Sequence, residues 1–295
     1  MIVSNCGGCL TPIGDPPLYL GYLKGVPFFW TMENLWPQAL LVVSLLLAIF
    51  FKIDYTLLKR EMASGEFCPP TKDDQPAEGF GIEVRGGLSI FFLVLMVLGV
   101  FIDPFLKQQF KIVDIPVGAT FQLAVATCAY RMADKSIHAA NNFSFFPVKE
   151  VGLLFLGIFL TMVPALAYLG ANGARFGIDS PTMYYFGTGL LSALLDNAPT
   201  YLNFLQISVG DRPISRETIM YLLENNPNGL KILSAISTGA VFFGAMTYIG
   251  NGPNFMVKSM AQSSGVKMPS FFGYLFLALA ILLPVLIVNW LIFIR

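Results

Sequence analysis

A polar cluster inside a long apolar run constrains this chain more than any other feature of its sequence. Within the run 182–205, the nine residues Ser192–Thr200 include an aspartate, an asparagine, a proline and two hydroxyl side chains. At membrane depth an ionisable side chain costs roughly 2.5–3.5 kcal/mol even on a lenient scale, and a proline removes a hydrogen bond from the helical ladder. Membrane proteins keep such clusters mainly where ions or substrates are held, so the run predicts a site inside the bilayer.

The composition is typical of a chain that spans a membrane. Hydrophobic residues make up 55% of the 295 residues and charged residues only 12%, against about 25% charged residues in a typical soluble domain. The net charge is zero, which gives no indication of a nucleic-acid partner, and the four scattered cysteines do not suggest a disulfide framework. We therefore expect an all-α, polytopic membrane protein.

Seven apolar segments are candidates for membrane helices, because a helix needs about 20 apolar residues to cross a bilayer. Five are continuous: 34–51, 87–104, 115–131, 150–170 and 270–293. Two are interrupted: 182–205, broken at Asp196–Pro199, and 230–261, broken at Gly250–Pro253. Interrupted helices of this kind are the best pointer in a sequence to the binding site of a transporter.

The polar segment 52–85 sets the expected orientation. It contains the basic residues Lys52, Lys59, Arg60, Lys72 and Arg85. Basic loops stay on the cytoplasmic side, so this segment is expected to be a cytoplasmic linker. Counting the spans from there, the hairpin segment 182–205 enters the membrane from its outer face.

Two glycine- and proline-rich breaks have similar sequences at a constant spacing. Residues 8–17 align with residues 244–253 at an offset of 236, and Gly, Thr, Ile, Gly and Pro match in register. Internal repeats are the usual plan of secondary transporters. The alternative is that the similarity arises by chance in a biased composition and that the chain is complete.

The offset also predicts how the repeats are divided. Subtracting 236 from 196 gives −40, so the first-repeat counterpart of Asp196 would precede Met1. We expect residues 1–51 to be the later part of a first repeat that is partly missing, and 52–85 to be the linker. Residues 86–295 are then a complete second repeat, with a hairpin at 182–205 and a broken helix at 230–261.

Three motifs resemble a known family: Gly189–Thr200, Thr11–Pro17 and Gly250–Asn254. They are similar to the ion transporter superfamily, which includes NhaD-type sodium/proton antiporters, citrate-transporter-like proteins, arsenite exporters and sodium-coupled dicarboxylate carriers. The dicarboxylate carriers have Ser-Asn-Thr at the hairpin tip. Here the tip is Asp196-Asn197-Ala198, which favours the antiporter branch.

The resemblance implies an inverted-repeat fold in which each repeat has a re-entrant hairpin and a broken helix. Hairpin tip and broken helix together bind sodium and substrate. It also implies a homodimer of the full-length protein, located in the cell inner (plasma) membrane. The chain departs from the family in lacking the first hairpin, which puts the first-repeat ion site in doubt.

At the hairpin tip, Asp196 and Asn197 offer oxygen ligands for sodium, and Ser192 and Thr200 add hydroxyl groups. Burial favours the protonated form of a carboxyl group, so Asp196 could exchange a proton for sodium. The alternative is a structural carboxylate paired with a basic residue, but the segment contains none.

At the two breaks, Asp15 and its counterpart Asn251 are candidate ligands together with Asn254, and Thr11 and Asn5 are weaker candidates. An alternative interpretation of Asp15 is an interfacial turn, because Asp-Pro-Pro often begins one.

The leading hypothesis is a sodium/proton antiporter that exchanges ions by alternating access. Its partners are the lipid bilayer, sodium ions and protons, and no cofactor is expected. Alternatives are a sodium-coupled symporter of citrate or a dicarboxylate, and a truncated, non-transporting remnant. An enzyme is not expected: an intramembrane aspartyl protease would pair Asp15 with Asp196, but the typical Gly-x-Gly-Asp motif is incomplete at Pro12–Asp15.

Overall fold

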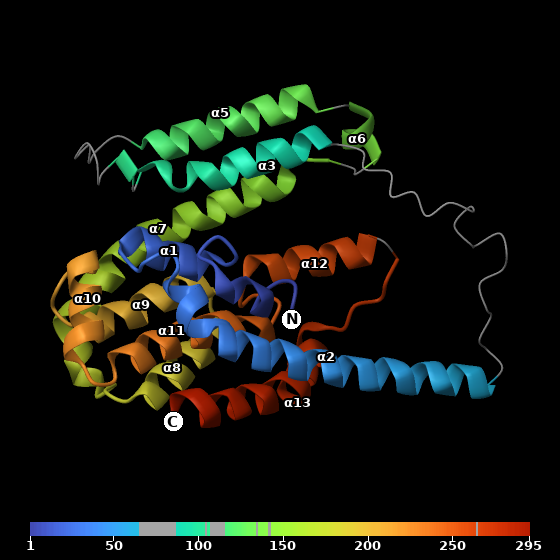
Figure 1. Cartoon of the computed structure of the whole chain (residues 1–295). Coiled ribbons are helices and arrows are strands. Elements are labelled where there is room, and N and C mark those ends of the chain that lie inside the picture. The colour runs from blue at the N-terminus through green and yellow to red at the C-terminus, as the bar shows by residue number, and fades with distance from the viewer. Residues whose placement is uncertain (65–86, 104, 107–115, 134, 141–142, 264) are drawn as a thin grey trace. The chain divides into compact units, whose positions relative to one another are not determined.

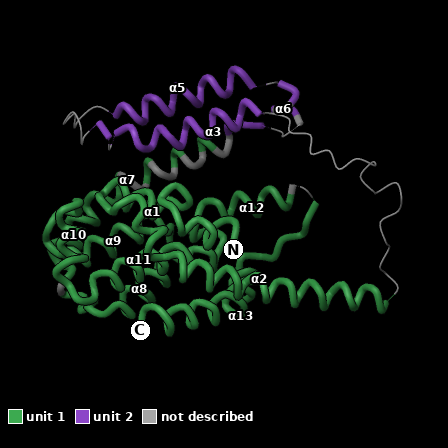
Figure 2. The backbone as a smooth tube through the Cα atoms, in the orientation of Figure 1, with its two compact units in different colours: residues 1–66, 147–295 green, residues 67–146 purple. Residues whose placement is uncertain are grey.

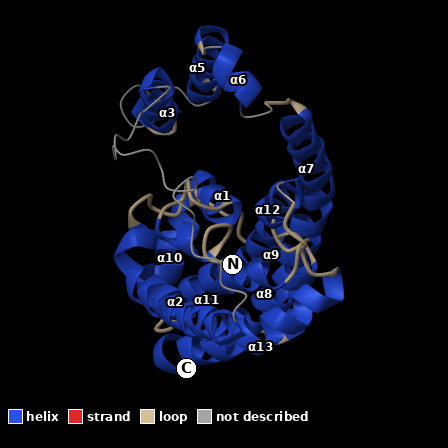
Figure 3. Cartoon of the chain, turned by 90° about the vertical axis from the view of Figure 1, so that its right-hand side faces the viewer, coloured by secondary structure: helices blue, strands red, loops and turns tan. Residues whose placement is uncertain are grey.

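The computed structural model describes residues 1–64, 87–103, 105–106, 116–133, 135–140, 143–263 and 265–295. Every regular element in these ranges is a helix (Figure 3). Three helical stretches are long and apolar enough to cross a membrane: Trp30–Ser64, Gly229–Met246 and Phe271–Ile294. The protein is therefore an all-α, polytopic membrane protein, as its sequence predicts.

The chain forms two compact units (Figure 2). The smaller unit, Phe67–Phe146, contains α3 (Gly87–Gly99), α5 (Val117–Met132) and α6 (Lys135–Ala140). Helices α3 and α5 approach closely at Gly99, where a Cβ would lie 2.8 Å from Gln122 Cγ. The carboxylate of Asp103, which follows α3 in the chain, accepts a hydrogen bond from the backbone N–H of Gly118 in α5 at 2.8 Å.

The larger unit consists of Met1–Glu66 and Pro147–Arg295. Its elements are η1 (Cys6–Leu10), α1 (Pro16–Lys24), α2 (Trp30–Ser64), α7 (Phe146–Asn172), η2 (Gly173–Phe176), α8 (Pro181–Leu194), α9 (Asn197–Val209), α10 (Arg216–Asn225), α11 (Gly229–Phe243), η3 (Gly244–Met246), α12 (Gly252–Ser263), α13 (Phe271–Asn289) and the terminal π-helix η4 (Trp290–Ile294).

Helix α11 forms the centre of the larger unit (Figure 1). It packs against α8, α9 and α2, and residues 232–243 are all buried. These residues are apolar or small on every side of the helix, which is the pattern of a helix enclosed by other helices. The broken end of α11 is therefore held inside the unit rather than at its surface.

The segment 182–205 folds into two helices, α8 and α9, that meet at a two-residue break. Leu195 and Asp196 have extended backbones, and α9 begins at Asn197. Pro199 falls in the first turn of α9, where a missing N–H is tolerated. The two arms pack against each other and both contact α11.

Helix α2 continues past the apolar span expected at 34–51 and ends at Ser64. The expected boundary at residue 51 thus falls within a helix, and residues 52–64 of the expected linker are helical and exposed. The remainder of that linker, 65–85, lies outside the described residues.

A buried polar network connects three helices of the larger unit. The side-chain amide of Asn289 on α13 donates to Gln38 Oε1 on α2 and to the hydroxyl of Tyr185 on α8, at 3.3 Å each. The hydroxyl of Tyr185 in turn donates to the carbonyl of Leu286 at 3.1 Å. These bonds compensate polar groups buried among apolar helices and fix α8 relative to α2 and α13.

Candidate functional site

The two glycine-rich breaks have the same local construction. In each, a short 3₁₀ helix leads into a bend and a new α-helix begins: η1 precedes α1, and η3 precedes α12. A Cβ on Gly14 would lie 2.4 Å from the carbonyl oxygen of Gly8, and a Cβ on Gly250 would lie 2.6 Å from that of Gly244. Glycine is needed at both crossings because any side chain would collide with backbone.

The two breaks are in direct contact. The side-chain amide of Asn251 donates to Asp15 Oδ1 at 2.9 Å and to the carbonyl of Ser4 at 3.3 Å. The side-chain amide of Asn5 donates to the carbonyl of Val241 at 3.3 Å. Residues 15 and 251, like residues 5 and 241, are 236 positions apart. Both hydrogen bonds therefore join residues at the offset of the aligned segments, and one of them, Asp15 with Asn251, joins counterparts within those segments.

The hairpin tip completes the arrangement. The side-chain amide of Asn197 lies 3.3 Å from both carboxylate oxygens of Asp15. Its backbone N–H donates to the carbonyl of Gly250 at 3.2 Å. Asp15, Asn197 and Asn251, which we call the Asp15 cluster, thus come from three segments far apart in the sequence and meet at one buried point.

Electrostatics sets the chemistry of the Asp15 cluster. The side chain of Asp15 is only 2% exposed, and no basic side chain in the described part of the chain forms an ion pair with it. Helices α1, α9 and α12 all begin at or beside the cluster, and their N-termini carry partial positive charge. A buried carboxylate held only by amides and helix ends is costly, so it favours uptake of a proton or a cation.

Two carboxamide oxygens at the site lack partners. Asn197 Oδ1 and Asn254 Oδ1 are both buried and accept no hydrogen bond within the described residues. The amide of Asn254 is oriented by bonds of 2.8 Å to the carbonyls of Gly244 and Thr247. Buried oxygens without a donor are the kind of ligand that a hard cation takes.

Asp196, the carboxylate that the sequence placed at the tip, has a different environment. It is half-buried, and its side chain caps α9 by accepting from the N–H of Ala198 at 2.9 Å. Thr200 donates to the carbonyl of Asp196 at 2.9 Å. Within the described residues the side chains of Asp15 and Asp196 have different hydrogen-bond partners.

The other predicted residues hold the breaks together. Ser192 donates to the carbonyl of Ala240 at 2.6 Å, which ties the hairpin to α11. Thr11 is half-buried at the end of η1, and its carbonyl accepts from the N–H of Gly14 at 3.0 Å. Among the predicted residues, Asp15, Asn197 and Asn251 are joined through their side chains, which meet at the carboxylate of Asp15.

Thr247 has a structural role in the site that was not predicted from the sequence. Its hydroxyl donates to the carbonyl of Ala193 at 2.6 Å and accepts from the N–H of Gly250 at 3.0 Å. One side chain thus joins the hairpin to the second break. Its match with Thr11 in the aligned segments was the available signal, but it did not indicate this contact.

We expect Thr247→Val to lower the free energy of unfolding by about 1–3 kcal/mol, because it leaves a buried N–H and a buried carbonyl without partners. The melting temperature measures the effect: samples are heated to a series of temperatures, and the fraction that stays monodisperse is determined by size-exclusion chromatography. Thr238→Val is the matched control: Thr238 is also buried, but its hydroxyl bonds the carbonyl of Ser234 within its own helix. Equal melting temperatures of the two variants would contradict the structural role assigned to Thr247.

A family model described as putative citrate transport matches residues 1–294. No curated protein and no solved structure matches the chain.

Proposed function

Since the chain belongs to this citrate-transport family, we propose that it is a cation-coupled secondary transporter whose coupling ion binds at the Asp15 cluster. The observation that supports this most is the burial of Asp15 without a basic partner among the described residues. Such a carboxylate is most stable when neutralised by a proton or a cation.

The ligands available fit sodium better than a divalent metal. The cluster supplies one carboxylate, and nearby lie the unpartnered carboxamide oxygens of Asn197 and Asn254. No group of three or more His, Cys, Asp or Glu side chains able to hold a metal ion occurs in the described residues. One negative charge and neutral oxygens suit a monovalent hard cation, and the amide of Asn197 would rotate to present its oxygen.

Competition between sodium and a proton for Asp15 is the minimal mechanism of exchange. With sodium bound, the carboxylate is ionised; with a proton bound, it is neutral, and the site has no charge to hold sodium. If only these two loaded forms reorient across the membrane, each sodium moved one way is exchanged for a proton moved the other way. This is the sodium/proton antiport hypothesis, now centred on Asp15.

Coupled citrate uptake is the second candidate, and the description of the family favours it. Helices α1, α9 and α12 begin at or beside the cluster, and their N-termini can hold an anionic group once a cation has neutralised Asp15. Sodium would then bind first and create the carboxylate site, which couples the two fluxes.

Two contacts support an inverted-repeat arrangement as part of this proposal. Asp15 bonds Asn251 and Asn5 bonds Val241, both at a separation of 236 residues. In transporters, related halves meet at the binding site in this way, and one half moves relative to the other during alternating access.

Proteoliposomes that contain the chain test the proposal. A pH-sensitive dye reports proton movement on addition of sodium, and labelled citrate reports uptake in a sodium gradient. Proton movement with sodium but not potassium supports antiport; sodium-dependent citrate accumulation supports symport. If neither flux occurs and sodium does not raise the melting temperature relative to potassium, the coupling-ion proposal is wrong.

A further inference from the structure

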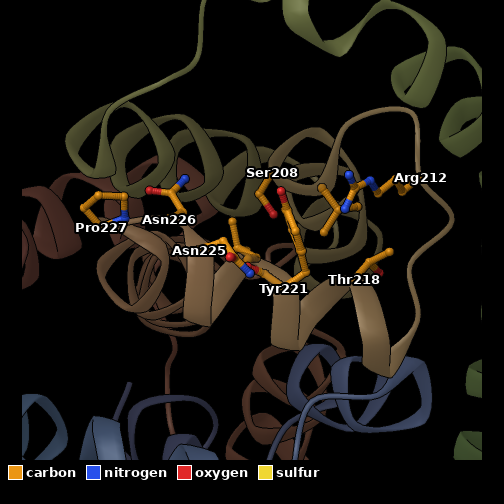
Figure 4. A pocket seen from close by; sticks show the side chains of 9 residues that line it. Ser208, Arg212, Thr218, Tyr221, Asn225, Asn226 and Pro227 are labelled. Atoms are coloured by element: carbon orange, nitrogen blue, oxygen red, sulfur yellow. The ribbon is translucent and has the colours of Figure 1, made fainter.

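A polar cavity lies at the opposite end of α9 from the Asp15 cluster. It has a volume of about 540 Å³ and is lined by Ser208, Val209, Arg212, Thr218, Tyr221, Leu222, Asn225, Asn226 and Pro227 (Figure 4). Helix α9 runs 13 residues from Asn197 to Val209, which corresponds to roughly 18 Å at about 1.5 Å per residue. The cavity is therefore separate from the site described above.

Arg212 is held in place from two sides. The buried side-chain amide of Gln206 donates to the carbonyl of Gly210 at 2.7 Å and to the carbonyl of Arg212 at 2.9 Å, which fixes the loop after α9. The guanidinium lies 4.3 Å from the centre of the Tyr221 ring. Stacking on an aromatic face leaves the N–H groups at the edge of the guanidinium available for hydrogen bonds.

The charge of the cavity favours an anion. Among the described residues, Arg212 is the only charged one that lines it, and its guanidinium forms no ion pair with the others. A neighbouring cavity of about 580 Å³ also reaches Arg212, but its lining includes the carboxylate of Asp211. The carboxylate of Asp211 repels an anion in the neighbouring cavity, whereas the described lining of the first cavity contains no carboxylate.

We infer that the first cavity binds an oxyanion, a carboxylate or a phosphate, through the guanidinium of Arg212. The planar fork of arginine matches two oxygens of such a group. The side-chain amides of Asn225 and Asn226 line the same space (Figure 4) and offer further N–H donors. The oxyanion can be a free small carboxylate or the phosphate of a lipid headgroup.

Binding of citrate and inorganic phosphate to the full chain in neutral phosphatidylcholine nanodiscs, measured by calorimetry in sodium-free potassium buffer, tests this inference. We expect Arg212→Gln to weaken binding by about 10- to 100-fold. Arg212→Lys keeps the positive charge but not the planar guanidinium. Its affinity is therefore expected to fall between those of the unmodified chain and Arg212→Gln. Arg216→Gln is the matched control, because Arg216 is exposed nearby but does not line the cavity, and it should bind like the unmodified chain.

The source of the oxyanion is distinguished by a second titration with anionic-lipid vesicles of phosphatidylglycerol. Binding of those vesicles that depends on Arg212, without binding of citrate, assigns the cavity to a lipid phosphate. Equal affinity of Arg212→Gln and the unmodified chain for all three probes, or no binding of any probe, overturns the inference. This binding is measured without sodium and is judged by its dependence on Arg212, so failure here and failure of the proposed transport site can be told apart.

Discussion

Replacement of Asp15 by Asn is expected to abolish sodium-coupled transport while the protein still folds. The variant keeps the shape of the side chain and its contacts with Asn197 and Asn251, but it removes the one buried charge of the cluster. We expect sodium affinity to fall by about 100-fold or more, equivalent to roughly 2.8 kcal/mol at 1.4 kcal/mol per tenfold. Removing an uncompensated buried charge should not lower stability.

Thermal stabilisation by sodium provides a readout that does not depend on orientation in the membrane. Sodium at about 100 times its dissociation constant stabilises a folded protein by roughly 2.7 kcal/mol. We expect a sodium-dependent rise in melting temperature for the unmodified chain and none for Asp15→Asn. Because protons compete with sodium for the same carboxylate, the rise should shrink as the pH is lowered.

Asp196→Asn is the matched comparison for Asp15→Asn. Asparagine is as good an N-cap as aspartate, so the cap on α9 is retained while the charge is lost. The sequence predicted that Asp196 is the exchanging carboxylate; the deeper burial of Asp15 favours Asp15 instead. Exchange that survives in Asp15→Asn but disappears in Asp196→Asn would return the role to Asp196.

The second large effect is expected for Gly250→Ala. A Cβ at this position would lie 2.6 Å from the carbonyl oxygen of Gly244 and 2.8 Å from that of Ser192. Both are backbone atoms, which can move only if the main chain is displaced. Overpacking of a well-packed core costs about 1–3 kcal/mol and sometimes more. Movement of the backbone at residue 250 to relieve these contacts would also disturb the hydrogen bond from Asn197 N–H to the Gly250 carbonyl. We therefore expect sodium-dependent stabilisation to be lost together with thermal stability.

Gly252→Ala serves as the control for Gly250→Ala. Gly252 belongs to the same break, but a Cβ there would meet nothing within 4 Å. We expect its melting temperature and its response to sodium to match those of the unmodified chain. If Gly250→Ala melts at the same temperature as Gly252→Ala, the close crossing at Gly244 is not present in the protein.

The sequence was sufficient to predict where the helices break. Polar residues and prolines are costly inside apolar runs, so the interruptions at Asp196–Pro199 and Gly250–Pro253 stand out without any structural information. The structure has its breaks at these positions or immediately beside them. The offset of 236 likewise identified Asp15 and Asn251 as counterparts.

Only the tertiary structure decided which of these residues touch. That Asp15 contacts Asn197, 182 positions away, depends on how the hairpin packs against the first break. The same packing buries Asp15 and leaves Asp196 half-exposed as a helix cap. A pattern along the chain records the cost of a polar group in an apolar segment, but the burial and partners of a carboxylate are set by neighbours from distant segments.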